Sequence, residues 1–123
     1  MTTQAKLMGS GIASAAALQI TSGDLTNSIT AAGTTQATAQ AVYAEVNLVT
    51  AVAVGAGVLL PSNRNVGDLL EVVNLGANAL AVYPPLSSAI GTGATNAAFS
   101  VPVSKVCTFR MVTSTLWVQN LSA

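Results

Sequence analysis

Hydrophobic and polar residues alternate in short runs along most of this chain, and glycine, proline and asparagine interrupt the runs. This pattern is typical of β-strands joined by turns. After residue 34, no long apolar run with a period of 3.6 residues is present. The pattern predicts strands over residues 36–43, 46–54, 68–73, 79–83, 98–101, 105–112 and 116–120.

The predicted strand 46–54 is apolar on both faces. Val46 and Leu48 share one face, and Asn47 and Val49 share the other. We therefore expect both faces to be covered, by a second sheet or by another subunit. Residues 75–78 predict a hairpin and residues 113–115 a tight turn. The expected fold is all-β: a compact β-sandwich or barrel of about seven short antiparallel strands.

The first 34 residues differ in composition from the rest of the chain. They are rich in Ala, Ser, Thr and Gly and have few large side chains, so they are poorly suited to forming a core. Gly9 and Ser10 dilute the apolar run that follows Lys6, which favours an arm over a signal peptide. We predict an extended, partly helical N-terminal arm over residues 1–34 and a β-domain over residues 35–123.

Charged residues are scarce: they make up 7% of the 123 residues, with four basic, four acidic and no net charge. A soluble domain ordinarily carries about a quarter of such residues. The scarcity indicates that other protein covers much of the surface, as in a building block of an assembly. Four scattered cations do not form a nucleic-acid surface, and no apolar stretch is long enough for a spanning helix. We expect neither nucleic acid nor membrane as a partner.

The residue types needed for most catalytic and metal sites are missing. Without histidine, Ser-His-Asp triads, Cys-His dyads and His-ligated metals are excluded, and the single Cys107 is expected in the core. Asp68 and Glu71 are three residues apart, so a regular strand points them to opposite faces. An enzyme would need a cleft joining Glu45 to one of them. We therefore expect no enzyme, cofactor or metal ion.

Several segments resemble a group of small structural proteins of tailed bacteriophages. Residues 72–85 read Val-Val-Asn-Leu-Gly-Ala-Asn-Ala-Leu-Ala-Val-Tyr-Pro-Pro, and residues 29–39, 59–61, 90–91, 97–101 and 116–118 extend the likeness over residues 29–121. The resemblance implies a capsid decoration (cement) protein on the exterior of the virion, made in the cytoplasm of the host bacterium. It also implies a homotrimer that binds the major capsid protein. A tail or fibre module that binds a host receptor or glycan is the alternative.

We predict two groups of partner-binding residues. One group consists of apolar residues and a lysine of the arm, and the other of large or cationic residues of the β-domain. Arginine is favoured at interfaces, although its stem also covers apolar surface. Trp117 is either a core anchor or an exposed stacking platform. The five aromatic residues of the chain are expected in the core or at a subunit interface. The partner-binding candidates are Lys6, Leu7, Ile12, Leu18, Ile20, Arg64, Arg110 and Trp117.

Overall fold

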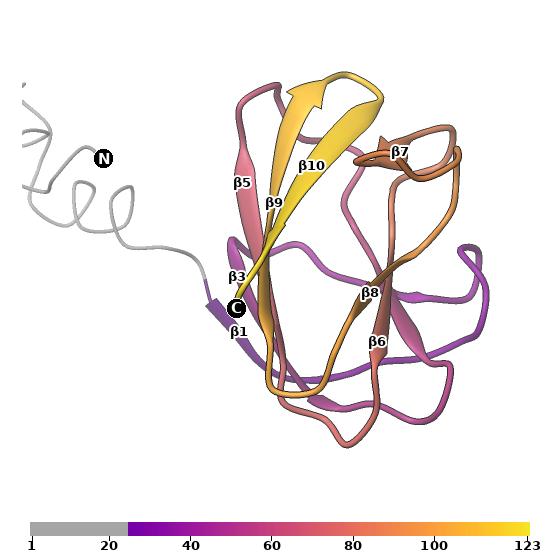
Figure 1. Ribbon diagram of the computed structural model, residues 1–123, viewed down its shortest axis with the longest axis vertical. Coiled ribbons are helices and arrows are strands. Elements are labelled where there is room, and N and C mark those ends of the chain that lie inside the picture. The colour runs from indigo at the N-terminus through magenta and orange to yellow at the C-terminus, as the bar shows by residue number, and fades with distance from the viewer. Residues whose placement is uncertain (1–24) are drawn as a thin grey trace, which may run out of the picture.

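The computed structural model describes residues 25–123, and this part of the chain consists of two β-sheets without a helix (Figure 1). The predicted all-β class is confirmed. A six-stranded sheet has the spatial order β1 (Leu25–Thr30), β3 (Val46–Ala51), β5 (Leu69–Asn74), β9 (Val106–Thr113), β10 (Leu116–Leu121) and β7 (Ala89–Ile90). A four-stranded sheet has the order β2 (Gln40–Ala41), β4 (Gly57–Leu59), β6 (Leu80–Tyr83) and β8 (Phe99–Val101).

The first six strands wind between the two sheets in a solenoid-like path. Strands β1, β3 and β5 pair in parallel in one sheet, while β2, β4 and β6 pair in parallel in the other. Each visit to the second sheet acts as the crossover that neighbouring parallel strands require. Antiparallel pairing joins β5 to β9, β9 to β10 and β6 to β8. The prediction of an antiparallel arrangement throughout was therefore wrong.

The segment after β5 shows why the strand pairing predicted from the sequence was wrong. Residues 75–78 were predicted as a hairpin, but β5 and β6 lie in different sheets. The Asn74 side chain accepts the Gly76 N–H (3.0 Å) and donates to the Asn78 carbonyl oxygen (2.9 Å). These bonds shape a corner that carries the chain across the core. By contrast, the turn at residues 113–115 does connect two antiparallel strands, β9 and β10, as predicted.

The sheet begins earlier than the sequence suggested. Strand β1 lies within the predicted arm of residues 1–34, and Ile29 and Ala31 are buried. Pairing with β3 and the contact of these two side chains with the core fix this segment. Of the predicted strand 36–43, only Gln40–Ala41 (β2) is strand, and residues 36–38 form a turn in which the Thr38 N–H donates to the Thr35 carbonyl oxygen (3.2 Å). The rest of the predicted arm, residues 1–24, lies outside the described residues.

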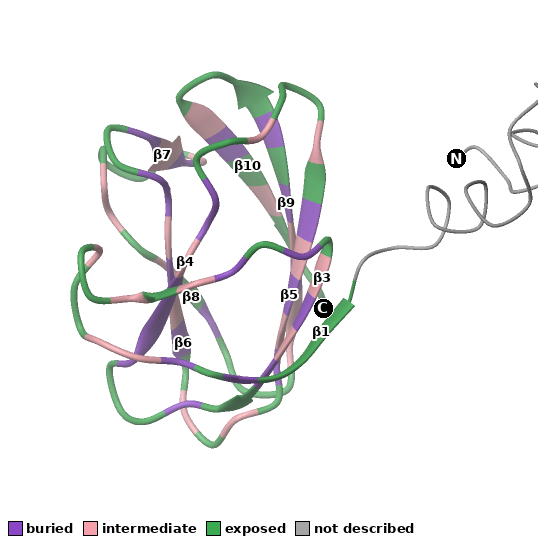
Figure 2. Cartoon of the chain, turned by 180° about the vertical axis from the view of Figure 1, so that it is seen from behind, coloured by how far each residue is buried: buried purple, intermediate pink, exposed green. Residues whose placement is uncertain are grey.

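The core lies between the two sheets (Figure 2). Phe109 and Trp117 are fully buried, and the Phe99 and Phe109 rings meet edge to face with centroids 6.2 Å apart. This confirms that three of the five aromatic residues anchor the core. By contrast, Tyr43 is 66% exposed and is not one of these core aromatic residues. Cys107 is buried in the same core, as expected for the single cysteine.

Two asparagines are fully buried, and their side chains bond to the backbone. Asn47 donates to the carbonyl oxygens of Ala44 (2.8 Å) and Glu71 (3.2 Å). Asn74 also donates to the Val101 carbonyl oxygen (2.9 Å) of β8, so it links the two sheets. Because these amides donate to backbone carbonyl oxygens, burying them is energetically tolerable.

Candidate functional site

One side of the six-stranded sheet packs on the core, and the other side is not covered by residues 25–123. Alternation along β5, β9 and β10 directs Leu70, Phe109 and Trp117 into the core and their neighbours outward. Strand pairing arranges the outward residues in three rows, which we call the outer face. The rows are Leu69–Arg110–Val118, Glu71–Thr108–Asn120 and Leu48–Val73–Val106.

The outer face has two mainly aliphatic rows, and the polar row Glu71–Thr108–Asn120 lies between them. Leu69 is 46% exposed and Val118 is 44% exposed, and both flank Arg110 in the same row. A shallow depression of about 350 Å³ lies over β5, β9 and β10, and these three side chains contribute to its wall. Scattered exposed apolar residues are common on proteins, but a contiguous patch marks an interaction surface. This patch is the strongest candidate site in the described part of the chain.

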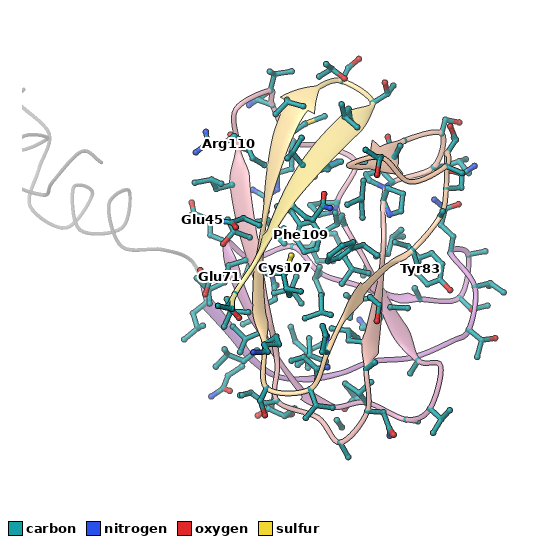
Figure 3. All side chains as sticks on the ribbon, viewed as in Figure 1. Glu45, Glu71, Tyr83, Cys107, Phe109 and Arg110 are labelled. Atoms are coloured by element: carbon teal, nitrogen blue, oxygen red, sulfur yellow. The ribbon has the colours of Figure 1, made fainter. Side chains whose placement is uncertain are left out.

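The outer face carries two opposite charges. Arg110 is exposed and donates a hydrogen bond from Nη1 to the Gly67 carbonyl oxygen (3.2 Å). Glu71 is half-buried on the neighbouring strand, opposite Thr108. Figure 3 shows both side chains on the side of the sheet that faces away from the second sheet, whereas Cys107 and Phe109 point between the sheets. The other N–H donors of the Arg110 guanidinium remain available to a partner.

Arg64 is half-buried and lies beside the outer face. Its Nη2 donates to the Tyr43 carbonyl oxygen, and its Nε is buried without a partner among the described residues. It lines a polar depression of about 250 Å³ together with Glu45, Asp68 and Leu69. Leu69 belongs to the outer face, so this depression borders it. Arg64 therefore holds the 61–67 loop against Tyr43 and presents only part of its guanidinium.

The remaining predicted partner-binding residues are Trp117 and the residues of the arm. Trp117 is fully buried, so it is a core anchor and does not present a contact surface. Its assignment as a partner-binding residue was wrong, because the alternation along β10 places it on the inward side. The candidates of the arm, Lys6, Leu7, Ile12, Leu18 and Ile20, lie outside the described residues.

Tyr43 is an exposed aromatic residue that the sequence did not single out as a contact. It lines a depression of about 230 Å³ that also includes Leu59, Pro61 and Leu86. Leu86 is 77% exposed. The outer-face residues Leu69 and Val118 were also missed individually, although the two-sided apolar pattern of the predicted strand 46–54 was a signal for such a face.

The described residues bring together little that supports chemistry. Within residues 25–123, no group of three or more His, Cys, Asp and Glu side chains is placed to hold a metal ion. Burial raises the pKa of Cys107 to about 11, against a smaller lowering effect of a hydrogen bond from the Asn120 backbone. A thiol with a raised pKa is a poor nucleophile. No helix in this part of the chain is long and apolar enough to cross a membrane.

Comparison with protein-family models, with curated proteins and with solved structures finds no match to this chain.

Proposed function

We propose that this chain is a structural protein of a bacteriophage particle. It decorates the capsid exterior and stabilises the shell by binding the major capsid protein as a homotrimer. It acts by binding, without catalysis or a cofactor. The observation that supports this proposal best is an uncovered aliphatic face on a chain in which only 7% of the residues are charged. We choose a phage capsid as the assembly on the sequence resemblance of residues 29–121 alone.

Stabilisation follows from mass action. A protein that bridges neighbouring capsid subunits binds the assembled shell more tightly than free subunits, so it favours assembly. A trimer presents three linked copies of each contact, and this multivalency strengthens an individually weak contact. In this proposal the two facing sheets act as a compact, sandwich-like body. Residues 1–24 join that body at β1, which is an edge strand of the six-stranded sheet.

The alternative, a tail or fibre module for a receptor or glycan, requires an exposed aromatic side chain beside polar groups. Trp117 is buried, and Tyr83 is half-buried with its hydroxyl donating to the Thr34 carbonyl oxygen (3.0 Å). Neither of these two presents the open ring face that stacking on a sugar needs. Tyr43 is 66% exposed, but the depression that it lines is walled mainly by aliphatic and proline side chains such as Leu59, Pro61 and Leu86, and has few of the polar groups that sugar hydroxyls need. The capsid proposal is therefore favoured.

Localisation in particles tests the proposal. Heads from phage that lack the gene are incubated with the purified full-length chain, separated by sedimentation and imaged by electron cryomicroscopy. We expect added density at three-fold positions on the exterior of the shell and heads that withstand higher temperature. Density on the tail would support the alternative. Absence of binding to any part of the particle would contradict both functions.

A further inference from the structure

We propose that residues 18–20 dock as a further strand on the open edge of β2 in the same chain. The docked strand closes a groove at the end of the two-sheet body where β1 and β2 lie, and it leaves residues 1–17 to reach a partner. This docking goes beyond the capsid role proposed above and is independent of it. Three features support it: the groove, the hydrogen bonding of the two edge strands, and a repeat in the sequence.

The core is open at the end of the body formed by β1 and β2. Both are edge strands of their sheets, and a groove of about 410 Å³ is lined by residues of both. Gln40 of β2 shares a row with Val58 and Val82, which are fully buried in the core. Gln40 itself is exposed and lines the groove. The core-facing row therefore runs out into the groove, and a solenoid needs a terminal segment that closes such an end.

Of the two edge strands, β2 is the one suited to strand addition. The Val42 N–H donates to the Leu59 carbonyl oxygen of β4 (3.0 Å), so alternation along β2 directs the Ala41 N–H away from β4, to the open edge. The Ala41 carbonyl oxygen accepts a hydrogen bond from the side chain of the adjacent Gln40 (3.2 Å). Strand β1 is irregular instead, because its register with β3 shifts twice and Ser28 has a φ of 59°. Bulges of this kind disfavour pairing with a further strand.

The sequence before β1 repeats the pattern that leads into β3 and β5. Each of the three strands directly follows a small residue and an acid, which are Gly23 and Asp24 before β1, Ala44 and Glu45 before β3, and Gly67 and Asp68 before β5. Four residues separate the end of β2 from the start of β3, and four residues also separate Ile20 from β1. A connection of the same length therefore serves a strand that ends at Ile20 and pairs with β2 of its own chain.

The docked segment has the side chains that this position requires. In a strand, Leu18 and Ile20 lie on one side and Gln19 on the other. Because the hydrophobic pattern sets the register, the two apolar side chains face the core, with Leu18 beside Gln40 and Ile20 beside Val42. The polar side chain then lies on the outer side of the sheet, and the main chain of the segment supplies an acceptor for the edge N–H of β2.

Disulfide trapping in the full-length chain tests the docking. Gln19→Cys and Ala41→Cys place two thiols at paired outward positions, where a strand separation of about 5 Å suits a disulfide. The native Cys107 is fully buried and does not compete. The control pairs Gln19→Cys with Ser114→Cys, which lies at an exposed position in the β9–β10 turn. After mild oxidation we expect most of the first variant, and little of the control, to be linked within single chains.

Two outcomes of the trapping experiment would overturn the proposal. A first variant that links no more than the control would show that the segment does not lie beside β2. Links that form mainly between two chains would show that the groove takes the segment of another copy. Non-reducing gels separate these outcomes by mass, and mass spectrometry of the linked peptides identifies the cysteines.

Charge substitution tests the placement of the side chains. Ile20→Asp places a carboxylate on the core side, so it should lower the melting temperature by at least about 4 °C. Gln19→Asp makes a charge at the neighbouring outward position and should shift it by less than about 2 °C. The Ala41 amide should exchange with deuterium at least about tenfold faster in Ile20→Asp than in the unmodified chain. Equal melting temperatures for the two variants, or unchanged exchange, would contradict the docked strand.

The docked strand and the capsid role are tested separately. A chain that forms the link but does not bind heads keeps the docked strand and contradicts the capsid role. A chain that binds heads but forms no link does the reverse.

Discussion

Removing the buried amide of Asn74 should destabilise the fold strongly. This side chain is fully buried where β5 turns toward the second sheet. It donates to the carbonyl oxygens of Asn78 and Val101 (both 2.9 Å) and accepts the Gly76 N–H (3.0 Å). Asn74→Ala leaves these three backbone groups without their partner in a place that water reaches poorly.

The expected magnitude follows from those three hydrogen bonds. A buried hydrogen bond contributes about 1 kcal/mol net, so Asn74→Ala should lower the free energy of unfolding by about 3 kcal/mol. Domains of this size have total stabilities of about 5–15 kcal/mol, so the loss is a large fraction. It corresponds to a fall in melting temperature of about 10–20 °C.

Urea denaturation measures this change. The fluorescence of the single tryptophan, Trp117, which is fully buried, reports unfolding. All variants are compared at one protein concentration, because association adds to apparent stability. Asn63→Ala, at an exposed loop position, is the control and should change the free energy by less than about 0.5 kcal/mol. Asn74→Asp keeps the shape but faces two carbonyl oxygens with a carboxylate, so it should be at least as destabilising as alanine. A loss below about 1 kcal/mol for Asn74→Ala would refute the role of this amide.

Three further predictions concern the core, a close backbone contact and the N-terminal segment. Because burial raises the pKa of Cys107 from 9.0 to about 11, the unfolded thiol ionises first. Stability should therefore fall between pH 9 and 11 by up to about 3 kcal/mol, a loss that Cys107→Ala should abolish in pH-dependent denaturation. Gly57→Ala places a Cβ 2.7 Å from the Ala81 carbonyl oxygen and 2.8 Å from the Tyr83 ring, and should cost about 1–3 kcal/mol; an unchanged melting temperature would contradict that contact. Deleting residues 1–17 should weaken binding to heads in sedimentation assays while leaving the melting temperature of the β-body nearly unchanged, and equal binding would show that the segment is not needed.

Much of the strand content followed from the sequence, because alternation and turn residues are local signals. Strands β5, β6, β8, β9 and β10 lie close to their predicted positions. The sequence did not predict which strands pair with one another, because a corner and a hairpin use the same residue types. At residues 75–78 the deciding contact comes from Val101 on β8, far away in sequence. Strand β1 was missed because three polar residues separate Leu25 from Ile29, so the segment shows no clear alternation of apolar and polar residues.

The sequence predicted that the sheet has a second interacting face, but it did not predict which residues form that face. Apolar residues on both faces of the predicted strand 46–54, and the low charge content, indicated a second covered face. Arg110 was chosen from the sequence and does lie on the outer face, whereas Trp117 lies on the inward side of β10. Leu69 and Val118 emerged only when strand register placed them beside Arg110. Register depends on long-range pairing, which a single sequence does not specify.

The mass of the unmodified protein in solution tests the central claim most directly. Sedimentation equilibrium at several concentrations should give a multiple of the 12.2 kDa chain mass, and three times that mass for the proposed homotrimer. A single-chain mass that persists at every concentration would contradict the proposed homotrimer.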